Sequence, residues 1–168
     1  MKIEYVVIAG VLIFFILLFV IFIVVSRKKV SKAHKKILFA LSNIENRLDD
    51  KEKIIIKTKD LVKDEKYLKN FQDEDFERDN IHELYEFLDE FMNKFNALII
   101  DDEELLNDKK IVKINEVMVD NEIKLDAAIN YYNDLIDSYL ELKSTFPINI
   151  VKIFSGFQKY KKIDIKKD

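Results

Sequence analysis

Residues 114–146 read INEVMVDNEIKLDAAINYYNDLIDSYLELKSTF, and this stretch decides the fold. Residues compatible with a core recur along it in steps of four and three, at positions 114, 118, 121, 125, 128, 132, 135, 139, 142 and 146. A repeat of about 3.5 residues is the period of a packed helix seam. The spacing predicts a helix from Lys109 to Thr145, which Pro147 ends because proline disfavours helical geometry in the residue before it.

Two shorter stripes of the same kind precede this helix. The first consists of Val30, His34, Leu38, Leu41, Ile44 and Leu48, and resumes at Ile55, Thr58 and Val62 after a polar gap near Lys51. The second consists of Ile81, Leu84, Leu88, Phe91, Phe95 and Leu98, and begins where Asn80 and Glu83 have the spacing of a capping box. We therefore expect an all-α fold with an antiparallel bundle of three to four long helices. A shorter helix at residues 64–72 would be the fourth if Asp49–Asp50 or Asp64 marks a bend.

The scarcity of glycine and proline supports this expectation. The 168 residues include two Gly, one Pro, and no Cys or Trp. Neither Gly nor Pro occurs between Gly10 and Pro147, which excludes phosphate-binding loops and dinucleotide fingerprints there, because both require glycine. The lack of cysteine excludes disulfides, thiolate zinc sites and a cysteine nucleophile. We expect turns at residues 70–80 and 101–108, which are rich in Asp and Asn.

Residues 5–25, YVVIAGVLIFFILLFVIFIVV, contain no charged residue. A helix of this length spans roughly 30 Å, the thickness of the hydrocarbon core of a bilayer. The run is longer than the apolar region of a signal peptide, and no small-x-small cleavage site precedes Ser26, so we interpret it as an uncleaved signal anchor. The predicted organisation is a transmembrane anchor at residues 1–26 and a helical bundle at residues 27–168, with a C-terminal segment at 147–168.

The segment that follows the span is strongly basic. Its charged side chains are Arg27, Lys28, Lys29, Lys32, Lys35 and Lys36, whereas Lys2 alone precedes the span. The positive-inside rule then predicts a cell-membrane protein with its N-terminus outside and residues 27–168 in the cytoplasm. We favour the interpretation that these side chains only fix the topology; the alternative is that they also contact anionic headgroups.

The chain offers no motif for catalysis, a cofactor or a metal. His34 and His82 have no partner at ligand spacing, and we expect His34 to be packed or to reach the membrane surface. An EF-hand loop that began at Asp101 would need glycine and glutamate where Leu106 and Val112 stand. No serine lies in a nucleophile motif, and a net charge of −3 gives no footprint for nucleic acid. We predict a protein that is not an enzyme and binds no cofactor, metal or nucleic acid.

Three polar residues lie on the long seam: Asn121, Tyr132 and Tyr139. Bundles use such groups to specify register when each amide or hydroxyl finds a partner. We favour this interpretation. The alternative is a ligand pocket among the helices.

Residues 114–157 resemble the C-terminal half of LemA family proteins. Those proteins combine a Thr-Glu-x-x-Ile helix with a Tyr-Tyr-Asn block, a Phe-Pro-x-Asn segment and a terminal Gly-Phe. The matching residues here are Glu122, Leu125, Ala128, Tyr131, Tyr132, Asn133, Tyr139, Phe146, Pro147, Asn149, Gly156 and Phe157. Residues 40–48 also resemble the first soluble helix of the family. The chain departs from the family pattern at Leu41, Asn121, Ile129 and Leu140.

The resemblance implies a membrane-anchored helical-bundle protein of bacterial cell envelopes, from a family without an established biochemical activity. We therefore expect a non-enzymatic scaffold or accessory protein, with coiled-coil-like helix packing, that binds a protein partner at the membrane. The contact is expected at residues 131–133 and 146–157. The alternative is a membrane-tethered sensor for a small molecule or lipid, with a pocket at Asn121, Tyr132 and Tyr139.

The end of the chain allows two arrangements. Residues 148–157 are mostly apolar, and residues 158–168 are mostly basic. This segment either folds back on the bundle as a latch or lies on the membrane surface. The Phe-Pro and Gly-Phe pairs shared with the family favour the latch.

Overall fold

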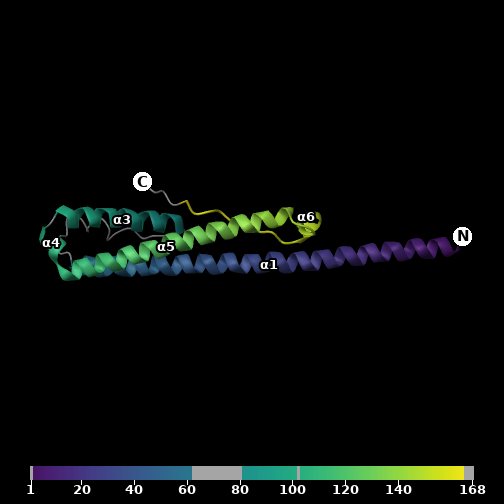
Figure 1. Cartoon of the computed structure of the whole chain (residues 1–168), viewed down its shortest axis with the longest axis horizontal. Coiled ribbons are helices and arrows are strands. Elements are labelled where there is room, and N and C mark those ends of the chain that lie inside the picture. The colour runs from purple at the N-terminus through teal and green to yellow at the C-terminus, as the bar shows by residue number, and fades with distance from the viewer. Residues whose placement is uncertain (1, 62–80, 102, 165–168) are drawn as a thin grey trace. The chain divides into compact units, whose positions relative to one another are not determined.

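The computed structural model describes residues 2–61, 81–101 and 103–164. These residues form helices and no β-strand, which confirms the all-α prediction (Figure 1). The α-helices are α1 (Lys2–Leu61), α3 (Ile81–Asp101), α4 (Glu103–Asn107), α5 (Lys109–Glu141) and α6 (Ile148–Val151), and the short 3-10 helices η2 (Leu142–Ser144) and η3 (Lys152–Phe154) flank α6. The short helix expected at 64–72, the expected turn at 70–80 and the Asn80 cap lie outside the described residues.

The chain divides into two compact units. Unit 1 consists of residues 1–39 and 131–162, and unit 2 consists of residues 40–130 and 163–168. Each unit thus combines one part of α1, one part of α5 and a piece of the chain that follows α6.

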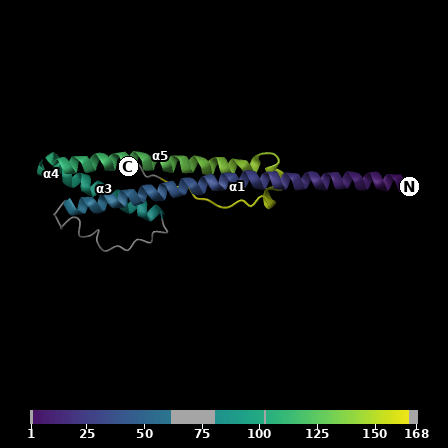
Figure 2. The ribbon, with the colours of Figure 1, turned by 90° about the horizontal axis from the view of Figure 1, so that it is seen from below.

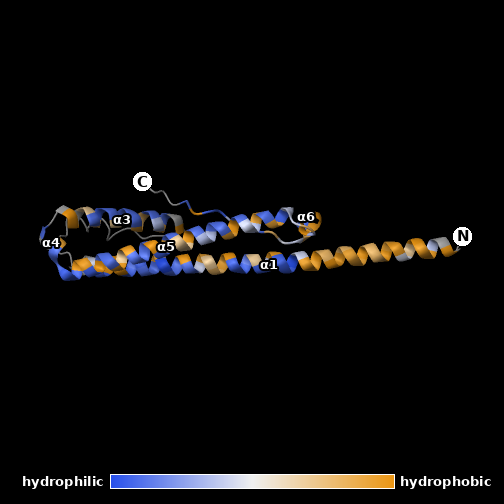
Figure 3. Cartoon of the chain, viewed as in Figure 1, coloured by the Kyte–Doolittle hydropathy of each residue, from blue (hydrophilic) through white to orange (hydrophobic). Residues whose placement is uncertain are grey.

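Helix α1 is uninterrupted from Lys2 to Leu61, and no glycine or proline lies between Val25 and its end. Its first part is apolar, and its large side chains are exposed, among them Leu12, Phe14 and Leu17. Figure 3 shows this part in the hydrophobic colour and the remainder of α1 as a mixture. By length and composition, the helix is able to cross a membrane.

Beyond residue 25, one face of α1 is buried. The buried residues are Ser26, Val30, Ile37, Ala40, Ile44, Leu48, Lys51, Ile55 and Thr58. The predicted stripe is correct at most of its positions. It is wrong at Leu38, which is 46% exposed, because Ile37 occupies the buried position one residue earlier.

In unit 2, residues 40–61 of α1 pack with α3 and with the first half of α5. Helix α5 runs antiparallel to both, whereas α1 and α3 run in the same direction (Figures 1 and 2). The short connection through α4 reverses the chain between α3 and α5. Residues 62–80 separate α1 from α3, so no short turn determines their relative direction.

Helix α5 begins after Asp108, in the Asp- and Asn-rich segment where a turn was expected. The Lys110 N–H donates a hydrogen bond to Asp108 Oδ1 at 2.6 Å, which satisfies one of the free donors at the helix start. The buried residues of its seam are Met118, Asn121, Leu125 and Ala128 in unit 2, and Tyr132 and Tyr139 in unit 1. The periodicity that predicted this helix is therefore confirmed.

In unit 1, α5 passes into η2, and the helix ends before Pro147 as predicted. Gly156 has φ +72°, a left-handed conformation that glycine adopts without strain. The tail (residues 155–162) then runs antiparallel to α5, since residue 158 bonds to Tyr139 and residue 161 bonds to Tyr132.

Candidate functional site

Tyr139 is the centre of the cluster that joins the tail to the helices of unit 1. Its side chain is 1% exposed. Its hydroxyl accepts a hydrogen bond of 2.7 Å from the Gln158 N–H. Its ring makes edge contacts with Phe157 and Tyr160, with centroids 5.1 and 5.3 Å away. The buried Tyr139 side chain thus contacts the tail at the backbone N–H of Gln158 and at the rings of Phe157 and Tyr160.

Two further tyrosines extend this cluster. The Tyr132 hydroxyl donates to the Lys161 carbonyl at 3.1 Å, and the Tyr160 hydroxyl shares a hydrogen bond with His34 Nδ1 on α1. Burial raises the pKa of Tyr132, and burial together with the neighbouring Tyr139 and Tyr132 raises the pKa of Tyr160. Both hydroxyls therefore keep their protons at neutral pH.

The structure therefore places the tail on the helices, in the latch arrangement. An ion pair of 2.7 Å between Lys162 Nζ and Asp137 adds to it at the surface. His34 is half-buried and bonded to Tyr160, in agreement with the packed role expected for it. Tyr160 was not singled out from the sequence, because Tyr139 and His34, its contacts on the helices, lie 21 and 126 positions away and no local pattern marks them.

The remaining motif residues of unit 1 divide by exposure. Pro147 is buried, and Asn133 and Phe157 are half-buried. Tyr131, Phe146, Asn149 and Gly156 are exposed, Tyr131 by 52% and Phe146 by 64%. The motif therefore contains both packed residues and residues on the surface.

In unit 2 the unexpected feature is Lys51. It is 2% exposed although it carries a charge. Its Nζ lies 2.7 Å from Glu122 Oε2 and 3.7 Å from Asp89 Oδ1, and 5.5 Å from the centroid of the Tyr85 ring. The contact to Glu122 is an ion pair without the alignment of a hydrogen bond. Lys51 thus connects α1 with both α3 and α5.

The contact with Lys51 gives Glu122 a structural role in unit 2. A buried ammonium is costly unless an opposite charge compensates it, and Glu122 supplies that charge. We interpreted Lys51 from the sequence as a gap in the stripe. Its spacing from Leu48 and Ile55 continues the steps of three and four, but a lysine at such a position does not by itself indicate burial.

Tyr85 shares this environment. It is 6% exposed and lies on α3 beside Lys51. Burial, and then the negative charges of Glu122, Asp89 and Asp126, hold the pKa of Tyr85 well above its usual value. The phenol therefore stays neutral over the physiological pH range.

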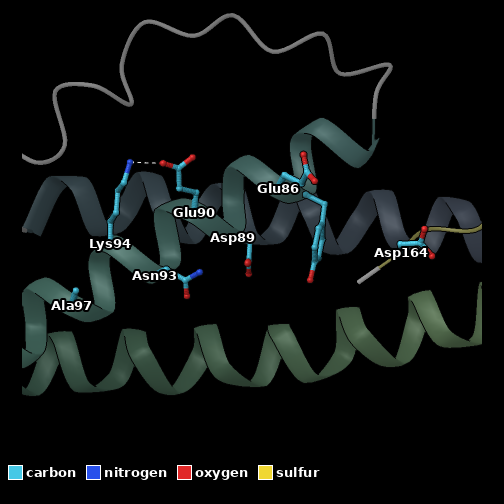
Figure 4. A pocket seen from close by; sticks show the side chains of 8 residues that line it. Glu86, Asp89, Glu90, Asn93, Lys94, Ala97 and Asp164 are labelled. Atoms are coloured by element: carbon cyan, nitrogen blue, oxygen red, sulfur yellow. Dashed lines mark hydrogen bonds and ion pairs between the residues drawn. The ribbon is translucent and has the colours of Figure 1, made fainter. Parts of the chain in front are cut away.

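A groove of about 500 Å³ runs along α3 in unit 2 (Figure 4). Its acidic lining consists of Glu86, Asp89, Glu90 and Asp164. Among these carboxylates, Glu90 pairs with Lys94 at 2.5 Å and Asp89 faces Lys51. Within residues 2–61, 81–101 and 103–164, no group of His, Asp or Glu is arranged to hold a metal ion.

The three seam residues proposed as a pocket all bond to backbone. Asn121 Nδ2 donates to the Arg47 carbonyl at 3.2 Å in unit 2. In unit 1, Tyr132 and Tyr139 bond to the tail. This is the arrangement expected of polar groups that fix register, and none of the three lines the groove along α3.

The basic residues that follow the apolar part of α1 are all exposed: Arg27, Lys28, Lys29, Lys32, Lys35 and Lys36. Arg27 differs from the others because its Nε donates to the Phe154 carbonyl at 3.0 Å. Four of them border a surface depression of about 440 Å³ together with Ser31. The helix thus presents a positive surface directly after its apolar part.

Comparison with known protein families, curated proteins and solved structures finds no match to this chain. The resemblance to the LemA family stays a prediction that rests on the motif residues.

Proposed function

We propose that this chain is a single-pass membrane protein of the LemA type whose helical part is a non-enzymatic scaffold for a protein partner. The observation that carries the proposal is the continuity of α1. Its apolar part exposes almost all of its side chains, and the same helix continues into packed, charged surroundings. Exposed apolar surface of this extent is unfavourable in water and suited to lipid.

The proposed orientation places residues 27–168 in the cytoplasm. The six exposed basic residues between positions 27 and 36 support it, because positive charges next to a span are retained on the cytoplasmic side. Carbonate extraction of native membranes should leave the full chain in the pellet, and detergent should release it. Removal of residues 1–26 should release it without detergent.

The absence of cysteine makes the topology directly testable. Lys124, which is exposed on α5, can be replaced by cysteine as the only thiol in the chain. We expect an impermeant maleimide to leave Lys124→Cys unlabelled in intact cells and to label it after lysis. Labelling of intact cells would reverse the proposed orientation.

An exposed apolar face on α5 in unit 2 supports a protein partner, in addition to the contact expected at residues 131–133 and 146–157. Val112, Val119 and Ile123 are exposed by 44, 50 and 65%. Their spacings of seven and four residues place them on one face of the helix, on the side away from buried Met118 and Leu125. A helix that is apolar on two faces is typical of a helix with a second packing partner.

A photocrosslinking amino acid at Ile123 tests this surface in intact cells. We expect a discrete protein adduct from position 123 and none from position 124, the adjacent exposed control. Adducts absent from both positions would argue against a partner on this face. Melting shifts of the full chain in detergent with a small-molecule panel, together with absent adducts, would favour the sensor alternative.

A further inference from the structure

The exposed apolar surface of unit 1 does not end with the N-terminal part of α1. The tip (residues 146–154), which joins α5 to the tail, exposes Phe146 by 64%, Ile150 by 57%, Ile153 by 86% and Phe154 by 51%. Ile148 and Val151 of the same segment are fully buried. The tip is therefore amphipathic, with one face packed in unit 1 and the other uncovered.

The tip contacts the apolar part of α1 directly. The rings of Phe146 and Phe22 lie 5.1 Å apart between centroids, and those of Phe154 and Phe19 lie 6.2 Å apart. Figures 1 and 2 both show α6 beside α1. Figure 3 shows α6 next to the boundary on α1 where the hydrophobic part ends and the charged part follows.

These contacts fix the depth of the tip relative to the span. Phe22 and Phe19 precede Val25, the last residue of the apolar run, by three and six residues. At about 1.5 Å per residue they lie roughly 4 and 9 Å inside the end of the run. Side chains that touch them share that depth, which is the depth at which interfacial amphipathic segments insert.

The polar groups of the tip fit the same position. Arg27, the first charged residue after the span, donates from Nε to the Phe154 carbonyl at 3.0 Å. This bond satisfies a carbonyl that would otherwise face an apolar medium at high cost. Lys143 and Lys152 are exposed around the tip, where their charges can meet headgroups.

We propose that the tip inserts into the bilayer crossed by residues 5–25, with the side chains of Phe146, Ile150, Ile153 and Phe154 between headgroups and acyl chains. The inference rests on the proposed membrane anchor and adds a second lipid contact, about 120 residues later in the chain. The occupant of this surface is lipid, because the tip is continuous with side chains that already face the bilayer. Unit 1 is thereby fixed to the membrane surface at two points instead of one.

The absence of tryptophan makes the depth measurable. The full chain is reconstituted in vesicles whose lipids carry bromine on the acyl chains, and each variant carries a single tryptophan. Phe154→Trp and Ile153→Trp report on the tip. Phe14→Trp reports on the span, and Phe39→Trp, an exposed position on α1 well beyond the span, is the aqueous control.

We expect both tip variants and Phe14→Trp to lose emission in brominated vesicles and to emit at shorter wavelength than Phe39→Trp, which should be unaffected. Bromine near the headgroup should quench the tip variants more than bromine deep in the chain. Since the vesicles contain no other protein, quenching there reports lipid contact alone.

The alternative results separate the two proposals. Quenching of Phe14→Trp together with tip variants that behave like Phe39→Trp would overturn the insertion of the tip and leave the anchor intact. An unquenched Phe14→Trp would overturn the anchor itself. Circular dichroism checks that the variants keep the helix content of the parent, and the two tip positions guard against a local defect at either one.

Discussion

In unit 1 the polar groups that join the tail to the helices are tyrosine hydroxyls, whereas in unit 2 the polar group among the three helices is a lysine ammonium. The difference follows from the secondary structure that each must hold. An extended tail leaves its own N–H and C=O groups unpaired, so side chains must satisfy them. Helices pair most of their own backbone groups, so buried polar side chains such as Lys51 and Asn121 help to specify which faces meet.

Substitutions should therefore affect the two units differently. Loss of a tyrosine in unit 1 should release the tail and leave the helices formed, whereas loss of the charge pair in unit 2 should affect the packing of three helices together. Four substitutions test this contrast, from the largest expected effect to the smallest.

Tyr139→Ala should have the largest effect. It removes a buried ring in contact with Phe157 and Tyr160, and we expect a loss of about 4 kcal/mol in the stability of unit 1. Tyr139→Phe keeps the ring and should lose only about 1 kcal/mol, from the bond to Gln158. Hydrogen exchange of tail and α3 peptides is the measurement. A tail that keeps its protection in Tyr139→Ala would contradict the latch.

Glu122→Gln should be the next most damaging change. It leaves the buried Lys51 ammonium with only Asp89, 3.7 Å away, and we expect a loss of about 3 kcal/mol in chemical unfolding in detergent.

Lys51→Met is its matched control. It leaves the carboxylates of Glu122 and Asp89, whose side chains are 30 and 39% exposed and can regain water, so we expect a loss of about 1 kcal/mol. A larger loss of stability for Lys51→Met than for Glu122→Gln would contradict this account. It would show that the Lys51 ammonium stabilises unit 2 itself, and that neutralising its charge matters less.

Gly156→Ala tests the start of the tail. A Cβ at this position meets no atom within 4 Å, so the cost comes only from the φ of +72° and should be about 1 kcal/mol. Gly156→Asn should lose less, because asparagine tolerates left-handed geometry. Limited proteolysis after Lys159 and Lys161 measures the release of the tail; equal rates for the alanine and asparagine variants would argue against a conformational cause.

Tyr85→Phe should have the smallest effect, visible only at alkaline pH. The pKa of Tyr85 is raised in the folded state by burial and by nearby carboxylates. The stability this provides is complete below the ordinary phenol pKa of about 10 and is lost as pH rises toward the folded value, because the unfolded chain ionises first. The stability of the parent relative to Tyr85→Phe should therefore fall by about 1 kcal/mol per pH unit above that point. A constant difference would mean that Tyr85 ionises equally in both states.

Much of the fold could be predicted from particular residues. The steps of four and three through Met118, Leu125 and Tyr132 predicted α5, and Pro147 predicted its end. The same rule misplaced Leu38, because two apolar residues, Ile37 and Leu38, competed for one position and only packing chose between them.

The site was less predictable. The motif identified Glu122 and Tyr139 as important positions, but the partner of each lies far away in the sequence. Lys51 is 71 residues from Glu122, and Gln158 is 19 residues from Tyr139. A charged residue in a predicted stripe looks like a gap until its counter-charge is known.

The sequence by itself determined the helices, the apolar span and the end of α5, because periodicity, hydrophobic length and proline geometry act over neighbouring residues. Only the tertiary structure decided that Lys51 is a core residue, that the tail lies along α5 and that the tip lies beside Phe19 and Phe22. Each of these depends on groups far apart in the chain, whose burial and pairing exist only once the helices have met.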